Sequence, residues 1–217
     1  MKVLLTDAGK RFNRDWIFRH LTYTFEEGNS YAIIGPNGSG KSTLLQVISG
    51  SMQVNEGKVE FRVGSQPASQ AKRGEESGVS IDNIFRYVSI CAPYLEVVEE
   101  MTLKEFLHFH HGFKPFLPEL SIEKIISIIG LEKAIHKQIR NYSSGMKQRV
   151  RLAQAIFSDV PAILLDEPCT NFDAAGISLY HQLINDYCKN RLVIVSSNDE
   201  VEYGFCKERI SISDYKK

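Results

Sequence analysis

A glycine-rich octapeptide constrains this chain more than any other feature of its sequence. Residues 35–42 read Gly-Pro-Asn-Gly-Ser-Gly-Lys-Ser, which fits the pattern G-x-x-x-x-G-K-[ST], and they lie between an apolar segment and a helical one. Glycines let backbone N–H groups approach a phosphate, because a Cβ atom would block that approach. The N-terminus of the following helix adds partial positive charge. The pattern predicts a phosphate-binding loop (P-loop) made of Gly35, Pro36, Asn37, Gly38, Ser39, Gly40, Lys41, Ser42 and Thr43.

Three side chains of this loop have separate expected roles. Lys41 is expected to reach the β- and γ-phosphates of a nucleoside triphosphate, and Ser42 to bind Mg²⁺ through its hydroxyl. Thr43 is expected near the α-phosphate. A coincidental glycine-rich turn is the competing explanation, and the order strand, loop, helix argues against it.

Length and charge narrow the choice of function further. The 217 residues suit one α/β domain with at most a small subdomain. A formal net charge of zero gives no overall basic field, so we expect no nucleic-acid partner. The longest apolar runs have the length of strands and fall short of the roughly 20 residues that cross a bilayer. If the protein serves a membrane process, we expect a separate chain to supply the membrane part.

The cysteines indicate the cellular compartment in which the protein is expected. The four of them are scattered and match no zinc spacing, and the N-terminus does not resemble a signal peptide. We therefore expect reduced thiols and a cytoplasmic protein.

Strand and helix patterns alternate along much of the chain, which predicts an α/β fold with a mainly parallel sheet. An N-terminal antiparallel β region is expected over residues 2–25, with a turn near 13–15, and a mobile surface loop over 64–80. A helical block at about 93–149 interrupts the alternation and is interpreted as an inserted α-helical subdomain, with the core at about 1–92 and 150–217. Further strands are expected at 31–34, 58–63, 87–90, 162–165 and 192–196, and helices at 41–49, 101–111, 121–129, 144–157 and 176–188.

Two acids close the apolar strand at 162–165. Asp166 and Glu167 should emerge at the carboxyl edge of a parallel sheet, where ligands collect. One carboxylate can hold Mg²⁺ while the next polarises an attacking water. Alone, such a strand end is more often a helix cap or a solvated turn, but beside a P-loop the catalytic interpretation gains weight.

Two further motifs complete a resemblance that covers nearly the whole chain. Residues 142–149, Tyr-Ser-Ser-Gly-Met-Lys-Gln-Arg, resemble the signature motif of the ATP-binding cassette (ABC) ATPase family, usually L-S-G-G-Q, and 170–173, Thr-Asn-Phe-Asp, resemble its D-loop. The order P-loop, helical lobe, signature, acidic strand and D-loop is specific to that family. The resemblance implies a single ABC ATPase domain with a P-loop NTPase (RecA-like) core, acting as the nucleotide-binding subunit of a transporter.

The resemblance also implies an assembly. Two chains, as a homodimer or a cassette heterodimer, would lie head to tail with two ATP molecules between them. Ser143 and Gly145 of one chain would contact the γ-phosphate held by the other, with Asp173 also at the nucleotide. A plain helix N-cap is the competing interpretation of residues 143–145. A separate transmembrane permease would be the second partner, which places the protein at the cytoplasmic, inner face of a membrane.

An aromatic ring usually stacks on the adenine in this family. Phe12 fits that position best, and Trp16 is the alternative; ordinary packing is as common a role for such a ring.

Two expected residues of the family are missing. Where it usually has Gln after the strand that precedes the helical lobe, this chain has Ala92 or Cys91, neither of which can bind Mg²⁺ as an amide oxygen would. Where it has a histidine after the last strand, this chain has Asn198, a catalytic candidate that can donate a hydrogen bond to the γ-phosphate but cannot carry charge. Because the candidate base Glu167 is present, we expect slow, Mg²⁺-dependent ATP hydrolysis. The alternatives are a non-transport ABC ATPase and a regulatory subunit that uses ATP only to dimerise.

Overall fold

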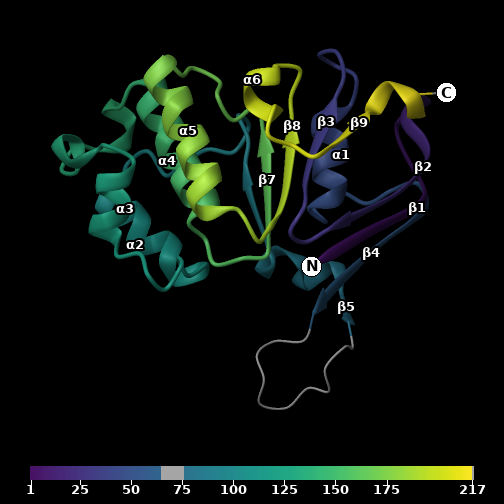
Figure 1. Ribbon diagram of the computed structural model, residues 1–217, viewed down its shortest axis with the longest axis horizontal. Helices are drawn as coiled ribbons and strands as arrows, with labels where there is room; N and C mark the ends of the chain where they lie inside the picture. Colours follow the sequence, from purple (N-terminus) through teal and green to yellow (C-terminus); the bar gives the residue numbers. More distant parts are fainter. Residues whose placement is uncertain (65–75, 217) are drawn as a thin grey trace.

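A five-stranded parallel sheet forms the centre of the protein, and a computed structural model describes its residues 1–64 and 76–216 (Figure 1). The strand order is β6-β7-β8-β3-β9. Each strand pairs in parallel with its neighbours, so all five carboxyl ends lie at one edge. The strands are β3 (Ser30–Ile34), β6 (Val88–Cys91), β7 (Ala162–Asp166), β8 (Leu192–Ser196) and β9 (Glu208–Ser211).

Both faces of this sheet are covered, as the apolar strand sequences predict. Along β7, Ile163 and Leu165 point to a core shared with the helices α4 (Ser144–Ile156) and α5 (Ala174–Tyr187). Ala162 and Leu164 point to a second core, shared with α1 (Lys41–Ile48) and the N-terminal strands. Side chains alternate between the faces of a strand, so each face contributes every second residue. The helix that follows the P-loop is thus buried between two sheets (Figure 1).

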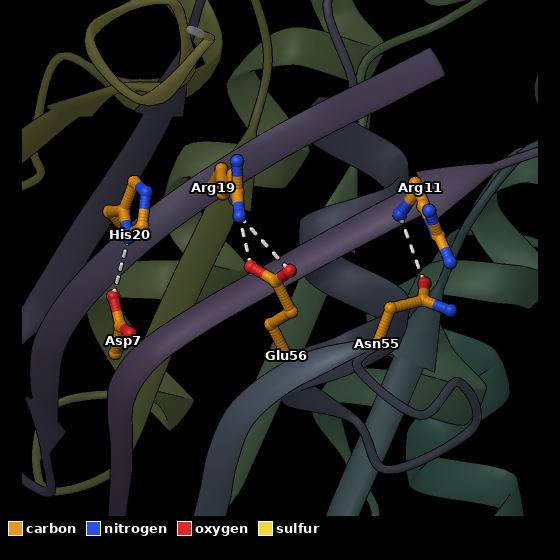
Figure 2. Close-up of polar contacts among 6 residues, drawn as sticks. All are labelled: Asp7, Arg11, Arg19, His20, Asn55 and Glu56. Carbon is orange, nitrogen blue, oxygen red and sulfur yellow. Dashed lines mark hydrogen bonds and ion pairs between the residues drawn. The ribbon is translucent and has the colours of Figure 1, made fainter. Parts of the chain in front are cut away.

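The N-terminal region forms a four-stranded antiparallel sheet with the order β2-β1-β4-β5. Its strands are β1 (Lys2–Phe12), β2 (Asp15–Glu26), β4 (Glu56–Gly64) and β5 (Glu76–Val79). Asn13, at φ 53°, and Arg14 make the turn from β1 to β2, close to the predicted position. Polar pairs tie the strands together: His20 with Asp7 at 2.7 Å, the backbone N–H of Arg11 with Asn55 at 3.0 Å, and Arg19 with both carboxylate oxygens of Glu56 (Figure 2).

The helical lobe contains α2 (Leu103–Phe113) and α3 (Ile122–Ile128) and packs on the same core as α4. Thr102 and Glu105 form a reciprocal capping box at the start of α2, and the Ser121 hydroxyl accepts the N–H of Lys124 at the start of α3. The expected boundary at about 149 falls inside α4, which continues from the lobe into the core. The boundaries of the helical subdomain, at about 93 and 149, stay predictions. In the part of the chain that the structure describes, the remaining helices are α6 (Glu200–Tyr203) and four 3₁₀ turns, Ile81–Arg86, Glu132–Ala134, Ile139–Asn141 and Ile212–Tyr215.

The expected α/β class is confirmed, with a parallel sheet, an antiparallel region and helices. The expectation of a surface loop throughout 64–80 is wrong at its C-terminal end, because β5 pairs there with β4, Phe61 lying opposite Val79. Cross-strand pairing outweighs the weak β-propensity of Glu-Ser-Gly-Val. The rest of that expected mobile loop, residues 65–75, lies outside the described residues. The short β9 and α6 were not expected.

Candidate nucleotide-binding site

The P-loop leaves the end of β3 and enters α1, as its motif predicts. Gly35, Gly38 and Gly40 have φ values of 150°, 74° and 109°, in the region that side chains disfavour. A Cβ on Gly40 would lie 2.2 Å from Cγ2 of Ile17, so only glycine fits there. A cavity of about 230 Å³ opens beside the loop and is lined by Ile17, Asn37, Gly38, Gly40, Lys41, Ser42, Thr43 and Glu167.

Lys41 is held inside this loop. Its side chain is almost wholly buried, and its Nζ donates to the carbonyl oxygens of Gly35 at 2.8 Å and Pro36 at 3.2 Å. A buried ammonium is costly without an anion or several acceptors. With two of its three donors on carbonyls, the lysine is oriented toward the cavity that it lines. An anion entering that cavity would meet a fixed positive charge and a helix N-terminus.

The carboxyl edge of the sheet adds a buried carboxylate beside the loop. Asp166 ends β7, is 2% exposed, and lies in register with Ser196 at the end of β8. Its Oδ1 and the Ser196 hydroxyl have no hydrogen-bond partner among the described residues. An unpartnered carboxylate oxygen at this edge, together with the Ser42 hydroxyl in the neighbouring cavity, is the oxygen-only ligand set that Mg²⁺ prefers. The predicted metal residues Ser42 and Asp166 therefore fit the ion.

Glu167 occupies an uncommon backbone conformation next to Asp166. Its φ is 45°, and its N–H donates to the carbonyl of Ser196 at 2.9 Å. A glutamate in the left-handed region is held there by its surroundings, and such residues concentrate at functional sites. The turn directs Glu167 to the cavity lined by Lys41 and Ser42. This position suits a base that acts on a water molecule next to a bound γ-phosphate.

A second hollow of about 580 Å³ holds the other predicted residues. Ser143, Gly145 and Asp173 line it together with Arg149 and Phe172. Ser143 is the N-cap of α4, its hydroxyl accepting the N–H of Met146 at 3.3 Å, and Asp173 caps α5 by accepting the N–H of Gly176 at 2.8 Å. The competing N-cap interpretation is therefore true of Ser143. It is compatible with anion binding, since a capped helix start still presents N–H groups.

The two hollows share no lining residue. The P-loop residues and Glu167 thus form one group on the chain, and Ser143, Gly145 and Asp173 form another. Phe12, Asp166 and Asn198 line neither hollow.

The two aromatic candidates have different surroundings. The ring of Trp16 has the guanidinium of Arg19, fixed by Glu56 in Figure 2, at 4.6 Å from its centroid, and that of Arg11 at 5.5 Å. Phe12, at the end of β1, is 46% exposed, and Nζ of Lys10 lies 5.5 Å from the centroid of its ring. Trp16 is half-buried and has two guanidinium groups over its ring, so it is less available to a base than the more exposed Phe12. The surroundings favour Phe12, although neither ring lines the P-loop cavity and its role stays a prediction.

The two positions that depart from the family pattern are both placed. Ala92 and Cys91 are buried, so neither presents a polar side chain to the cavity. Burial raises the pKa of the Cys91 thiol to about 12. Asn198 is exposed and directly follows Ser197, beyond the end of β8.

Three residues near the candidate site were not expected from the sequence. Tyr94 lies two residues beyond Ala92, and its hydroxyl interacts with the Gln46 side chain. Burial is the main reason that the pKa of Tyr94 is raised, and the negative charge of Asp166 raises it further. Ser196 could have been suspected from its place at a strand end beside Asp166. Ile17 carries no sequence signal, because only the fold brings β2 to the P-loop.

A parallel sheet with a P-loop at its carboxyl edge, a buried aspartate and an adjacent glutamate defines a nucleotide-binding α/β protein of the P-loop class. Comparison with known proteins narrows that class. The sequence model of the ABC transporter family matches residues 18–170, more than half of the chain. The chain belongs to this family.

Two curated relatives and one solved structure illustrate the similarity. The chain is 28% identical over 212 residues to YhcH of Bacillus subtilis, an uncharacterized ABC transporter ATP-binding protein, covering 96% of this chain and 65% of that protein. It is 32% identical over 196 residues to a probable metal transport system ATP-binding protein of Thermotoga maritima, covering 87% and 71%. A dimeric ATP-binding cassette solved with ADP and Pi matches with a TM-score of 0.77 and 21% identity, covering 96% and 93%.

The similarity to the solved structure, at 21% identity, supports the fold alone.

The chain spans slightly less than two thirds of the length of YhcH. None of the helices in residues 1–64 and 76–216 has the length and apolar character needed to cross a bilayer.

Proposed function

We propose that this chain binds and slowly hydrolyses ATP with Mg²⁺ as the motor subunit of a membrane transporter. The division of the P-loop and signature motifs between two hollows of one chain is the observation that carries the proposal. A phosphate bound at Lys41 would have no signature residue of the same chain beside it. Ser143 and Gly145 likewise lie in a hollow that contains no P-loop residue of the same chain. Two chains placed head to tail would bring the P-loop of each chain to the signature motif of the other. The dimer would then be closed and contain two complete sites.

The chain's own residues supply each step. P-loop N–H groups and Lys41 bind the phosphates, while Ser42 and Asp166 would hold Mg²⁺. When bound, the ion would neutralise charge that develops on the phosphate oxygens. Glu167 accepts a proton from the attacking water, and Asn198 donates a hydrogen bond to the γ-phosphate. Adenine stacking is assigned to Phe12, and the Asp173 loop is assigned to the dimer interface.

An exposed apolar hollow supports a membrane partner. Phe85 and Leu95 are exposed and line a cavity of about 300 Å³ between the core and the helical lobe. Large apolar side chains grouped at a surface hollow mark interaction sites. We assign this hollow to a separate permease chain, which places the protein at the inner, cytoplasmic face of a membrane.

Phosphate release tests this function. The purified protein should release phosphate from Mg-ATP, and a detergent extract of its native membranes should stimulate the rate. Leu95→Asp should keep the basal rate and lose the stimulation. Absence of turnover together with tight ATP binding would instead favour a regulatory subunit, the reading that the buried Ala92 supports. Turnover stimulated by nucleic acid rather than membranes would support a non-transport ATPase.

Replacing Asn198 by His should raise the basal rate of phosphate release roughly 10-fold. A charged imidazole donates a hydrogen bond about twice as strong as a neutral amide, which corresponds to 1–1.5 kcal/mol or so in the transition state. Below pH 7 the effect should be largest, since more of the histidine is charged. The same substitution at Asn185, an exposed position on α5, is the control. Equal rates for Asn198→His and wild type would remove Asn198 from the reaction.

A further inference from the structure

Glu202 is a buried carboxylate that the proposed mechanism does not use. It lies in α6, is 5% exposed, and makes no salt bridge with the described residues. Burial raises its pKa above the ordinary glutamate value; hydrogen bonds from Ser197 and from the N–H of Cys169 act in the opposite direction. Burying a carboxylate without a cation is costly, so its hydrogen bonds must be well made to retain it.

Both partners of this carboxylate belong to loops that carry candidate catalytic residues. Oε1 of Glu202 accepts the N–H of Cys169 at 2.6 Å, two residues after Glu167. The Ser197 side chain also interacts with this carboxylate and lowers its pKa, and Ser197 immediately precedes Asn198. The Ser197 hydroxyl oxygen in turn accepts the N–H of Asp199 at 2.9 Å. One side chain therefore joins the loop after β7 to the loop after β8.

The backbone of Glu202 is fixed from a third direction. Its carbonyl accepts the hydroxyl of Tyr180, a fully buried side chain on α5. The Glu167 loop has a separate contact, because Nε2 of Gln148 donates to the carbonyl of Pro168 at 2.8 Å. Losing the Glu202 carboxylate would thus remove the bond that holds the N–H of Cys169. The N–H of Glu167 would remain bonded to the carbonyl of Ser196, and Pro168 would remain bonded to Gln148. We therefore expect displacement of the loop rather than its unfolding.

We propose that Glu202 is a positioning residue that sets the loops of Glu167 and Asn198 relative to each other. This inference rests on the proposed function, because the two loops act together only during ATP hydrolysis. A base must be placed to within a fraction of an ångström, and a 1 Å error costs on the order of 100-fold in rate. Glu202 lies outside the P-loop cavity and so has no part in gripping the phosphates.

Three variants test this proposal. Glu202→Ala removes the acceptor of the Cys169 N–H and the interaction with Ser197. We expect kcat to fall roughly 10- to 100-fold with KM for ATP changed less than about 3-fold. Glu202→Gln keeps an oxygen that can accept the N–H of Cys169, so it should retain most of kcat. Glu200→Gln, exposed on the same helix and paired with Arg209, is the matched control and should match wild type.

Hydrogen exchange separates this inference from the proposed function. In Glu202→Ala, the amides of residues 167–171 and 196–199 should exchange faster than in wild type and in Glu200→Gln, whether or not the protein hydrolyses ATP. A wild-type protein without turnover would overturn the hydrolytic function and leave the exchange result to decide the link between the loops. Unchanged exchange in Glu202→Ala, or a loss in kcat matched by an equal rise in KM, would overturn the positioning role.

Discussion

Replacing Glu167 by Gln is expected to lower ATP hydrolysis roughly 10²- to 10⁴-fold, the usual contribution of a positioned general base. The substitution preserves the size of the side chain and the backbone turn at φ 45°, with its N–H bonded to Ser196. The P-loop and Lys41 stay intact, so ATP binding should persist. Without hydrolysis to reopen it, the ATP-bound dimer should accumulate.

Two measurements check this expectation. Single-turnover phosphate release gives the rate, and size-exclusion chromatography with ATP and Mg²⁺ gives the dimer. Glu119→Gln, an exposed position in the helical lobe, controls for the loss of a negative charge. A Glu167→Gln protein that turns over ATP as fast as wild type would rule out Glu167 as the base.

Mixing two inactive variants is expected to restore activity. Lys41→Ala removes the buried ammonium from the P-loop cavity and should abolish ATP turnover. Ser143→Asp keeps an N-cap acceptor for the N–H of Met146 and places a negative charge in the signature hollow, where it should repel a γ-phosphate. Each variant alone should fall to background.

A mixed dimer contains one site in which an intact P-loop faces an intact signature. Random pairing makes half of the dimers mixed, each with one of two sites intact, so an equal mixture should recover roughly a quarter of the wild-type rate. Ser121→Asp, the same exchange at the N-cap of α3, is the control and should stay active. Mixed dimers isolated with two affinity tags that stay at background would contradict the head-to-tail arrangement.

The sequence was most informative where a function needs adjacent residues. The P-loop, the pair Asp166–Glu167 and the apolar runs of β7 and β8 are contiguous patterns, and the fold they predict was confirmed. Strand β5 was missed because Glu-Ser-Gly-Val has little strand propensity of its own and depends on pairing with β4.

Glu202 shows the same limit within the site. A glutamate in a polar stretch near the C-terminus gives no sign that it is buried. Its importance arises only when the fold places it between Cys169 and Ser197, residues that lie 33 and 5 positions away. The contact between Tyr94 and Gln46 likewise depends on the tertiary fold. Such contacts join segments whose separation in sequence has no periodicity to detect.

The separation of the P-loop hollow from the signature hollow has a kinetic consequence. If each reaction centre needs material from two molecules, the rate per molecule in dilute solution should depend on how many neighbours it meets. A membrane partner that holds two copies side by side would replace that chance encounter by a high effective concentration. Under the proposed function, the partner would then control turnover by bringing the two copies together, without contacting ATP itself.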